Sequence, residues 1–374
     1  MKIHLFDLLN MPNMKIVVNI QPSLKNRIKN MINDDIYSFA RELKTNPTRL
    51  YEYFIWKKSF TPLNVLFKLA KKFDISHLEI EKNIVSYKQQ HVPAKNSIEN
   101  PRLPIEISPY MTSIVANLFF DGSVPKDGKG TYYNQKNKDI MNDFIKKINH
   151  VFGGVQYKVK RDHRGVLKCR MPRLIGEICK DIYRIKDFGS FDSRIPRNIF
   201  NLPEEHKISF FLTAILDEGS ISYDGDIQFG VSNLGMMIDF KKLCNSINIE
   251  TGEIKKHKQE GHYYVYIKSI KRVNNFLNRF SKKYPEISLN YKGERLKKAI
   301  QIKQQKFSYT KDFADKRKNL ILSELGNKKC SVNYLADKFI ISPRTIRRYM
   351  YKLMKEKKVS RIKFGAEFIY RTLG

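Results

Sequence analysis

Two stretches of this 374-residue chain share one pattern: Ile114-Val-Ala-Asn-Leu-Phe-Phe-Asp-Gly-Ser123 and Phe211-Leu-Thr-Ala-Ile-Leu-Asp-Glu-Gly-Ser220. Each is an apolar run that ends in an acidic residue followed by Gly-Ser. The two acids, Asp121 and Glu218, are 97 residues apart. A later match, Met141–Phe144 with Met237–Phe240, keeps a spacing of 96 residues. A spacing that persists over several elements predicts an internal duplication.

Each copy predicts the same order of elements, αββαββα. An apolar helix ending in acid-Gly-Ser precedes a hairpin, an amphipathic helix, a second hairpin and a closing helix. The Asp224-Gly225 pair predicts the first turn of the second copy. In residues 155–160, apolar residues alternate with polar ones such as Lys158 and Lys160, so we expect one apolar face and one basic face. The predicted fold class is therefore α+β.

The repeated acid-Gly-Ser end of each apolar helix suggests a functional site. A simple alternative is that Gly122 and Gly219 end their helices in the left-handed conformation. However, a carboxylate at a helix C-terminus faces the negative end of the helix dipole, which costs roughly 0.3–1 kcal/mol. Because this occurs twice, we expect a compensating charge. A divalent cation would supply it, leaving coordination positions for water and phosphate oxygens, as metal-assisted phosphodiester hydrolysis requires.

These residues resemble the motifs of the LAGLIDADG homing endonuclease family, of the single-chain, two-repeat type. The resemblance covers about residues 104–285. It implies a pseudo-symmetric pair of αββαββα units, with the two motif helices packed at the centre and the sheets forming a saddle over the major groove of DNA. It also implies that Asp121 and Glu218 bind Mg²⁺ or Mn²⁺ at the scissile phosphates. Some members of the family have lost cleavage and act as transcription regulators or RNA maturases.

The second copy leaves two assignments of its acid open. Counted back from Gly219, Asp217 falls where the family usually has a small residue of the helix contact. Asp217 then lies either in the helix interface or in the place of Glu218 as the metal ligand. In the first copy Phe120 occupies the corresponding small-residue position.

The flanking regions predict DNA-binding modules. Residues 36–78 are similar to a Cro/repressor-type helix-turn-helix, with Arg49 on the second helix. The C-terminal region resembles a winged helix, in which Ser342 caps a candidate recognition helix and Pro343 is its first residue. The resulting domains are 1–95, 104–285 and 312–374, and the proline-rich stretch 89–109 is expected to be a linker.

The amino-acid composition also favours DNA as the partner. The formal net charge is +33, which favours a polyanion such as DNA. No apolar run is long enough to span a bilayer, and the four cysteines form no C-x-x-C pair. We therefore expect a protein without membrane contact, located in the cytoplasm with the nucleoid and monomeric by its pseudo-symmetry.

The sequence thus predicts a site-specific, divalent-metal-dependent endonuclease acting on double-stranded DNA. A cleavage-deficient regulator is the alternative, and an RNA maturase is a weaker one because helix-turn-helix modules suit duplex DNA. The candidate catalytic residues are Asp121, Glu218, Asp217, Lys168 and Lys256. The candidate DNA-binding residues are Arg49, Lys158, Lys160, Arg170, Lys258, Lys268, Arg344, Thr345, Arg347 and Arg348.

Overall fold

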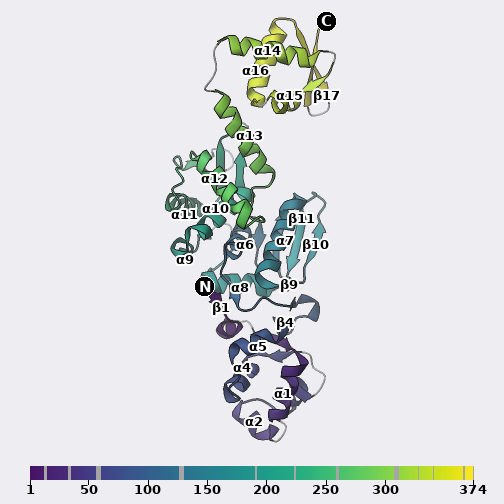
Figure 1. The fold of residues 1–374 in the computed structure, drawn as a ribbon, viewed down its shortest axis with the longest axis vertical. Coiled ribbons are helices and arrows are strands. Elements are labelled where there is room, and N and C mark those ends of the chain that lie inside the picture. Colours follow the sequence, from purple (N-terminus) through teal and green to yellow (C-terminus); the bar gives the residue numbers. More distant parts are fainter. Residues whose placement is uncertain are drawn as a thin grey trace.

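The computed structural model describes residues 1–11, 15–32, 35–55, 60–125, 130–189, 192–222, 225–257, 261–306, 311–326, 328–339, 341–364 and 367–373. Figure 1 shows the N-terminal region (purple), the repeated central region (blue to green) and the C-terminal region (yellow) following one another along the molecule. One hydrophobic core extends from Leu5 to Leu296, and a separate core spans Ile321 to Tyr370. The C-terminal region is therefore an independently packed unit.

The N-terminal region contains the helices expected in residues 36–78 and, in addition, a sheet that the sequence did not predict. The helices are α1 (Pro22–Ile32), α2 (Ile36–Glu42), α3 (Pro47–Leu50), α4 (Leu63–Lys72) and α5 (His77–Lys82), with the short helices η1 (Leu5–Asn10) and η2 (Tyr51–Ile55). The strands are β2 (Ile16–Ile20), β3 (Thr61–Pro62) and β4 (Ile84–Gln89). The apolar run of β2 is buried on both faces, which is typical of a strand inside a core.

The proline-rich stretch between the first two regions is ordered and paired. It holds η3 (Ala94–Asn96), β5 (Ile98–Glu99) and β6 (Ile105–Glu106). β5 pairs with β4 on one side and with β9 (Gly154–Val155) on the other, while β6 pairs with β1 (Lys2–Ile3). Because this sheet crosses from one region into the next, the N-terminal region is docked on the central one and the stretch is not an open linker.

The central region contains the predicted order of elements twice. The first half comprises α6 (Pro109–Phe120), β7 (Gly122–Ser123), β8 (Thr131–Gln135), α7 (Lys138–Phe152), β10 (Lys158–Arg161), β11 (Leu167–Met171) and α8 (Arg173–Tyr183). After α9 (Arg197–Asn201), the second half comprises α10 (Glu204–Glu218), β12 (Gly219–Ile221), β13 (Ile227–Val231), α11 (Leu234–Ser246), β14 (Lys255–Lys256), β15 (Tyr263–Ile267) and α12 (Ile270–Lys283). The sheets have the equivalent strand orders β7-β8-β11-β10 and β12-β13-β15-β14.

The helices α6 and α10 pack against each other at the centre. Residues 109–119 of α6 and 208–216 of α10 are all buried, which explains why these stretches are largely apolar all round rather than along one stripe. The glycines that follow the acids do not have the left-handed conformation. A Cβ atom at Gly122 would lie 2.5 Å from the Leu118 Cα, and one at Gly219 would lie 2.5 Å from the Ile215 carbonyl oxygen. Glycine is needed because the strand turns back closely over the last helical turn.

The strand after Val155 has the expected apolar and basic faces, since Val159 lies opposite Cys169 and Lys160 lies opposite Lys168, but neither face is buried. All four residues of β10 are exposed, and Tyr157 and Val159 are 47% and 37% exposed. β10 is the edge strand of its sheet, and both of its faces are exposed to solvent. The next strand, β11, does alternate, with Leu167, Cys169 and Met171 buried and Lys168 and Arg170 exposed.

The C-terminal region has the predicted winged-helix order. After α13 (Tyr291–Lys306), it comprises α14 (Lys311–Leu325), β16 (Cys330–Ser331), α15 (Val332–Phe339), α16 (Pro343–Lys355), β17 (Val359–Phe364) and β18 (Glu367–Thr372). Its three strands form one sheet in the order β16-β18-β17. In the described part of the chain, no helix has the length and apolar character needed to cross a membrane.

Candidate nucleic-acid interface and acidic centre

The two predicted acids meet where the central helices end. Asp121 is the residue directly after α6, and Glu218 is the last residue of α10. Burial raises the pKa of Asp121 to about 6, although the charge of Lys292 opposes the shift. Burial is the larger cause that raises the pKa of Glu218 to about 7, and the negative charge of Asp121 is the second. The two carboxylates are therefore close enough for their charges to interact.

Strand pairing shows which acid of the second half corresponds to Asp121. Gly122 lies opposite Tyr133, and Gly219 lies opposite Phe229. Tyr133 stacks on Phe144 and Phe229 stacks on Phe240, so these two pairs occupy equivalent places in the two halves. The residue before each glycine is then equivalent, which matches Asp121 with Glu218 and Phe120 with Asp217.

Asp217 lies inside the helix interface. Its carboxylate accepts a hydrogen bond from the Asn117 amide at 2.8 Å and another from the Tyr133 hydroxyl at 2.9 Å. Burial, and then the charge of Asp121, raises the pKa of Asp217 to about 8. Both donors belong to the first half, so Asp217 is one side of a polar contact between the halves.

Lys147 completes this contact, and sequence reasoning did not identify it. Its ammonium donates to the Asn117 side-chain oxygen at 2.6 Å and to the Ser113 hydroxyl at 2.7 Å. Burial lowers the pKa of Lys147 to about 8, against the opposing charges of Asp217, Asp143 and Glu286. Ser113 in turn bonds the Thr213 hydroxyl at 2.7 Å. We call Ser113, Asn117, Lys147, Thr213 and Asp217 the interface network.

Lys292 is the second cation that sequence reasoning did not identify. It lies near the start of α13, after the duplicated region, and is 7% exposed. Its ammonium donates to the carbonyl oxygens of Ile215, Leu216 and Gly219 at 3.2, 2.5 and 2.5 Å. These are carbonyls at the C-terminus of α10, where the helix dipole is negative. The compensating charge expected at this helix end is thus supplied in part by the chain itself.

The outer face of the first sheet, which lies away from the helices, carries basic side chains in line with Asp121. Asn134 donates from its backbone N–H to the Asp121 carbonyl oxygen at 2.9 Å. Lys168 lies opposite Asn134, and Lys160 lies opposite Lys168. Directly opposite residues share a face, and strands are about 4.8 Å apart, so Lys168 is two strand spacings from Asp121.

A second row on the same face runs parallel to the first. Lys158 lies opposite Arg170, which lies opposite Tyr132. The Lys168 ammonium is 4.5 Å from the centre of the Tyr132 ring. The structure therefore gathers four predicted DNA-binding or catalytic residues, Lys158, Lys160, Lys168 and Arg170, on one exposed face.

The outer face of the second sheet differs. Tyr264 lies opposite Gly230 and Lys255, and Gly230 is the position on β13 nearest to Glu218. Tyr264 thus takes the place that Lys168 has in the first half. Tyr266, beside it on the same face, is 40% exposed. This face carries two tyrosines and, on its edge strand, the exposed Lys255.

The structure places the remaining predicted residues of this sheet elsewhere. Lys256 lies opposite Tyr263, which shares its face with the buried Val265, so Lys256 does not point to the outer face. Lys268 forms an ion pair with Glu250 at 2.8 Å. Lys258 lies outside the described residues.

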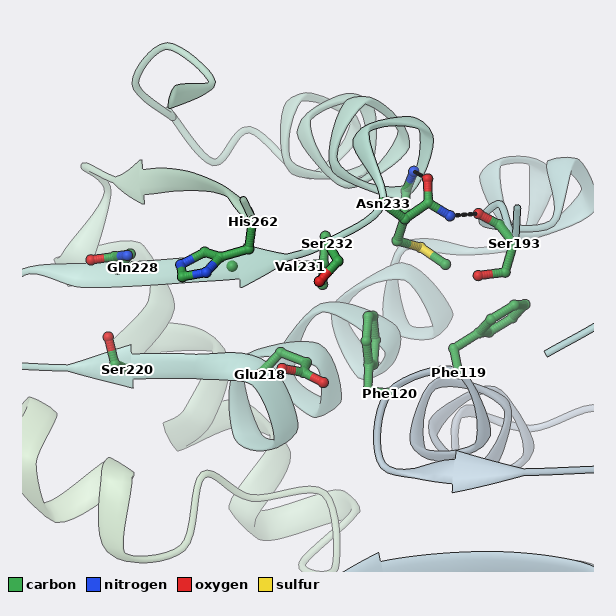
Figure 2. Close-up of a pocket in the computed structure, with 12 residues that line it drawn as sticks. Phe119, Phe120, Ser193, Glu218, Ser220, Gln228, Val231, Ser232, Asn233 and His262 are labelled. Carbon is green, nitrogen blue, oxygen red and sulfur yellow. Dashed lines mark hydrogen bonds between the residues drawn. The ribbon is translucent and has the colours of Figure 1, made fainter. Parts of the chain in front are cut away.

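Glu218 borders a cavity of about 390 Å³ that opens beside the second sheet. Figure 2 shows Phe119 and Phe120 on one side of it, with Glu218, Ser220, Gln228 and His262 on the other. Among the described residues, no group of three or more His, Cys, Asp or Glu side chains could hold a metal ion. A metal at this centre would therefore have two carboxylate ligands at most, with the others coming from water or phosphate.

The flanking modules place their predicted residues on the surface. In α16, Ser342 accepts the Thr345 backbone N–H at 3.2 Å, which confirms the predicted cap. Arg344, Arg347 and Arg348 are exposed, whereas Thr345 is half-buried against the cap. In the N-terminal region, α3 is capped by Asn46 and the exposed Arg49 borders a hollow with Lys68.

Residues 317–372 match the model of the DeoR-like helix-turn-helix domain. No curated protein matches the sequence.

Several solved structures are similar to the chain. One describes mesophilic variants of the homing endonuclease I-DmoI (12% identity, 46% of this chain and 93% of that chain, TM-score 0.33). Another is I-DmoI in complex with DNA and Mn (14%, 47% and 96%, TM-score 0.32). A third is full-length DUF199/WhiA from Thermatoga maritima (12%, 66% and 90%, TM-score 0.33). The family-model match over residues 317–372 agrees with the helix-turn-helix domain expected at the C-terminal end.

Proposed function

We propose that this protein binds a specific sequence of double-stranded DNA. The observation that carries the proposal is the pair of basic rows on the outer face of the first sheet, one of which continues to Asp121 at the helix ends. Such a face suits the major groove, with lysines and arginines reaching phosphates and base edges. In this proposal the two sheets form a pseudo-symmetric saddle over one duplex, and one chain suffices because both acids come from it.

The winged helix extends the contact along the same duplex. Arg344, Arg347 and Arg348 project from α16, the helix that the helix-turn-helix arrangement places in the major groove. The N-terminal module, with Arg49, adds a third contact. The three domains, bounded at about 95–104 and 285–312, then act as linked binding units whose affinities reinforce one another.

For chemistry, we propose that Asp121 and Glu218 hold Mg²⁺ or Mn²⁺ at the scissile phosphates. Two interacting carboxylates with raised pKa values form a donor set that a divalent cation stabilises, so the residues fit this role. The cation would activate a water and neutralise charge on the phosphate oxygens. Lys168, in the same row as Asp121, would contact the neighbouring phosphate.

Binding without cleavage is the second candidate. Two observations favour it. Lys292 already places a positive charge at the end of α10, and Tyr264 stands in the second half where the first half has Lys168. A protein of this kind is a DNA-binding regulator.

The test starts from a target site selected by affinity from a random duplex library. A plasmid carrying this site is then incubated with Mg²⁺, Mn²⁺ or a chelator, and nicks on each strand are mapped. We expect Asp121→Asn and Glu218→Gln to abolish cutting and keep binding, since an amide preserves shape without the charge.

Asp217→Asn is the matched control, because it changes a neighbouring acid that faces the helix interface. We expect it to cut. Tight binding by the wild type with no nick under either metal would leave the regulator as the function. Failure to select any site would remove the proposal of specific DNA binding itself.

A further inference from the structure

Lys292 is a buried lysine whose environment matches that of a bound cation. Its three partners are backbone carbonyl oxygens at 2.5, 2.5 and 3.2 Å. Burial lowers the pKa of Lys292, while the charges of Asp217, Asp121 and Glu218 act in the opposite direction. All three acids of the centre are thus within electrostatic reach of one ammonium group.

The position of Lys292 follows from the chain beyond the repeat. After α12, the chain returns past the helix ends and starts α13 against β12. Lys292 is the second residue of α13, and its neighbours in that helix that face outward, such as Lys297, are exposed. Its contacts are with the second half only, since Ile215, Leu216 and Gly219 all belong to α10 or β12.

We propose that Lys292 is the built-in cation of the acidic centre, which competes with a divalent ion for the negative charge of Asp121 and Glu218. The centre then needs no metal to approach a DNA phosphate, and a divalent ion binds it weakly as long as the ammonium is present. This proposal rests on the proposed role of Asp121 and Glu218 at the phosphates.

The test is Mn²⁺ binding by the full chain without DNA, measured by calorimetry and by the loss of the free-ion signal in electron paramagnetic resonance. We expect Lys292→Met to bind Mn²⁺ at least about tenfold more tightly than the wild type, because a unit charge near the ligands is removed. Lys297→Met, on the exposed side of the same helix, should leave the affinity unchanged. An unchanged or weaker affinity in a folded Lys292→Met protein overturns the proposal.

A second variant separates charge from hydrogen bonding. Lys292→Gln keeps a donor near the carbonyl oxygens but carries no charge, so it should also bind Mn²⁺ more tightly, whereas Lys292→Arg should not. If Lys292→Met does not fold, the difference in Mn²⁺ affinity between Lys292→Gln and Lys292→Arg tests the proposal instead. Tighter Mn²⁺ binding without any DNA cleavage would support the role of Lys292 and contradict hydrolysis. If the wild type cleaves DNA while Lys292→Gln and Lys292→Arg bind Mn²⁺ equally tightly, hydrolysis is supported and the role of Lys292 is contradicted.

Discussion

The two halves of the central region have the same element order and the same strand order. At one equivalent position of the interface between them, however, one half has an aromatic side chain and the other has a carboxylate. In the first half, Phe120 reaches into the second half, where its ring lies 5.9 Å from that of Phe210 and 5.7 Å from that of Phe229. In the second half, Asp217 reaches into the first, where Asn117 and Tyr133 bind it.

This difference makes the interface between the two halves asymmetric. The pocket for Phe120 is aromatic, and the pocket for Asp217 is polar and contains Lys147. Exchanging the partners would bury a carboxylate among phenyl rings, which is costly without a hydrogen-bond partner. Each helix therefore fits only the opposite half, and two copies of one half do not form an equivalent pair.

The outer faces of the two sheets also differ in chemical character. The first sheet presents four basic residues, Lys158, Lys160, Lys168 and Arg170, whereas the second presents Tyr264 and Tyr266 with one lysine, Lys255. A basic face binds phosphates over a long range, whereas tyrosines contribute contact area and hydrogen bonds at short range. We expect the first half to supply most of the salt-dependent affinity for DNA.

The largest effect is expected at the interface network. Lys147→Met leaves Asp217 without its nearby cation and removes two donated hydrogen bonds. Leaving a buried acceptor without its donor costs roughly 1–3 kcal/mol, and Lys147 donates to two such acceptors, so the free energy of unfolding should fall by about 2–6 kcal/mol. Urea unfolding followed by circular dichroism measures it. The exposed neighbour Lys146 provides the control, since Lys146→Met should change the free energy by less than about 0.5 kcal/mol.

The double variant Lys147→Met/Asp217→Asn tests the coupling. If the network acts as one unit, the loss in the double variant should be smaller than the sum of the two single losses, because both changes disrupt the same set of contacts. Additive losses would contradict an electrostatic link between Lys147 and Asp217.

A smaller effect is expected from pH. The folded pKa values of Asp121, Glu218 and Asp217 lie at about 6, 7 and 8, above their ordinary values near 4 in the unfolded chain. Between pH 5 and 8 the folded state holds more protons, so stability should fall as the pH rises. The lowered pKa of Lys147 acts only above about pH 8. Thermal unfolding in a chelator should show this decline.

Asp121→Asn/Glu218→Gln should flatten this pH profile, because both groups then lose their titration. The sign is the decisive observation. A free energy of unfolding that increases from pH 5 to pH 8 would show that the acids are paired rather than desolvated.

The smallest effect is expected on the sheet faces. Lys168→Gln should weaken binding of the selected duplex and reduce the log–log salt slope by about 1, the amount for one phosphate contact. Lys256→Gln should leave both unchanged, because its side chain lies off the outer face. Fluorescence anisotropy at several salt concentrations measures the two slopes. Equal losses in both variants would mean that the DNA does not lie on the outer face.

Much of the fold follows from local pattern. The repeat spacing predicted both αββαββα units, and Ser342-Pro343 predicted the start of α16. These predictions succeed because periodicity, helix caps and acid-Gly-Ser ends depend on residues within one or two turns. The partners Asp121 and Glu218 were also predictable, since equivalent positions in a duplicated unit are brought to equivalent places.

The sequence by itself therefore determined the elements, their duplication and the acids at the two helix ends. Only the tertiary structure decided which charges those acids meet. Lys147 and Lys292 belong to helices far along the chain from Asp217 and Glu218, and nothing in their neighbouring residues distinguishes them from the many exposed lysines. The exposed β10, the face of Lys256 and the N-terminal sheet were likewise decided by which layers cover each strand. Burial and electrostatic contact depend on distance in space, which local sequence patterns do not contain.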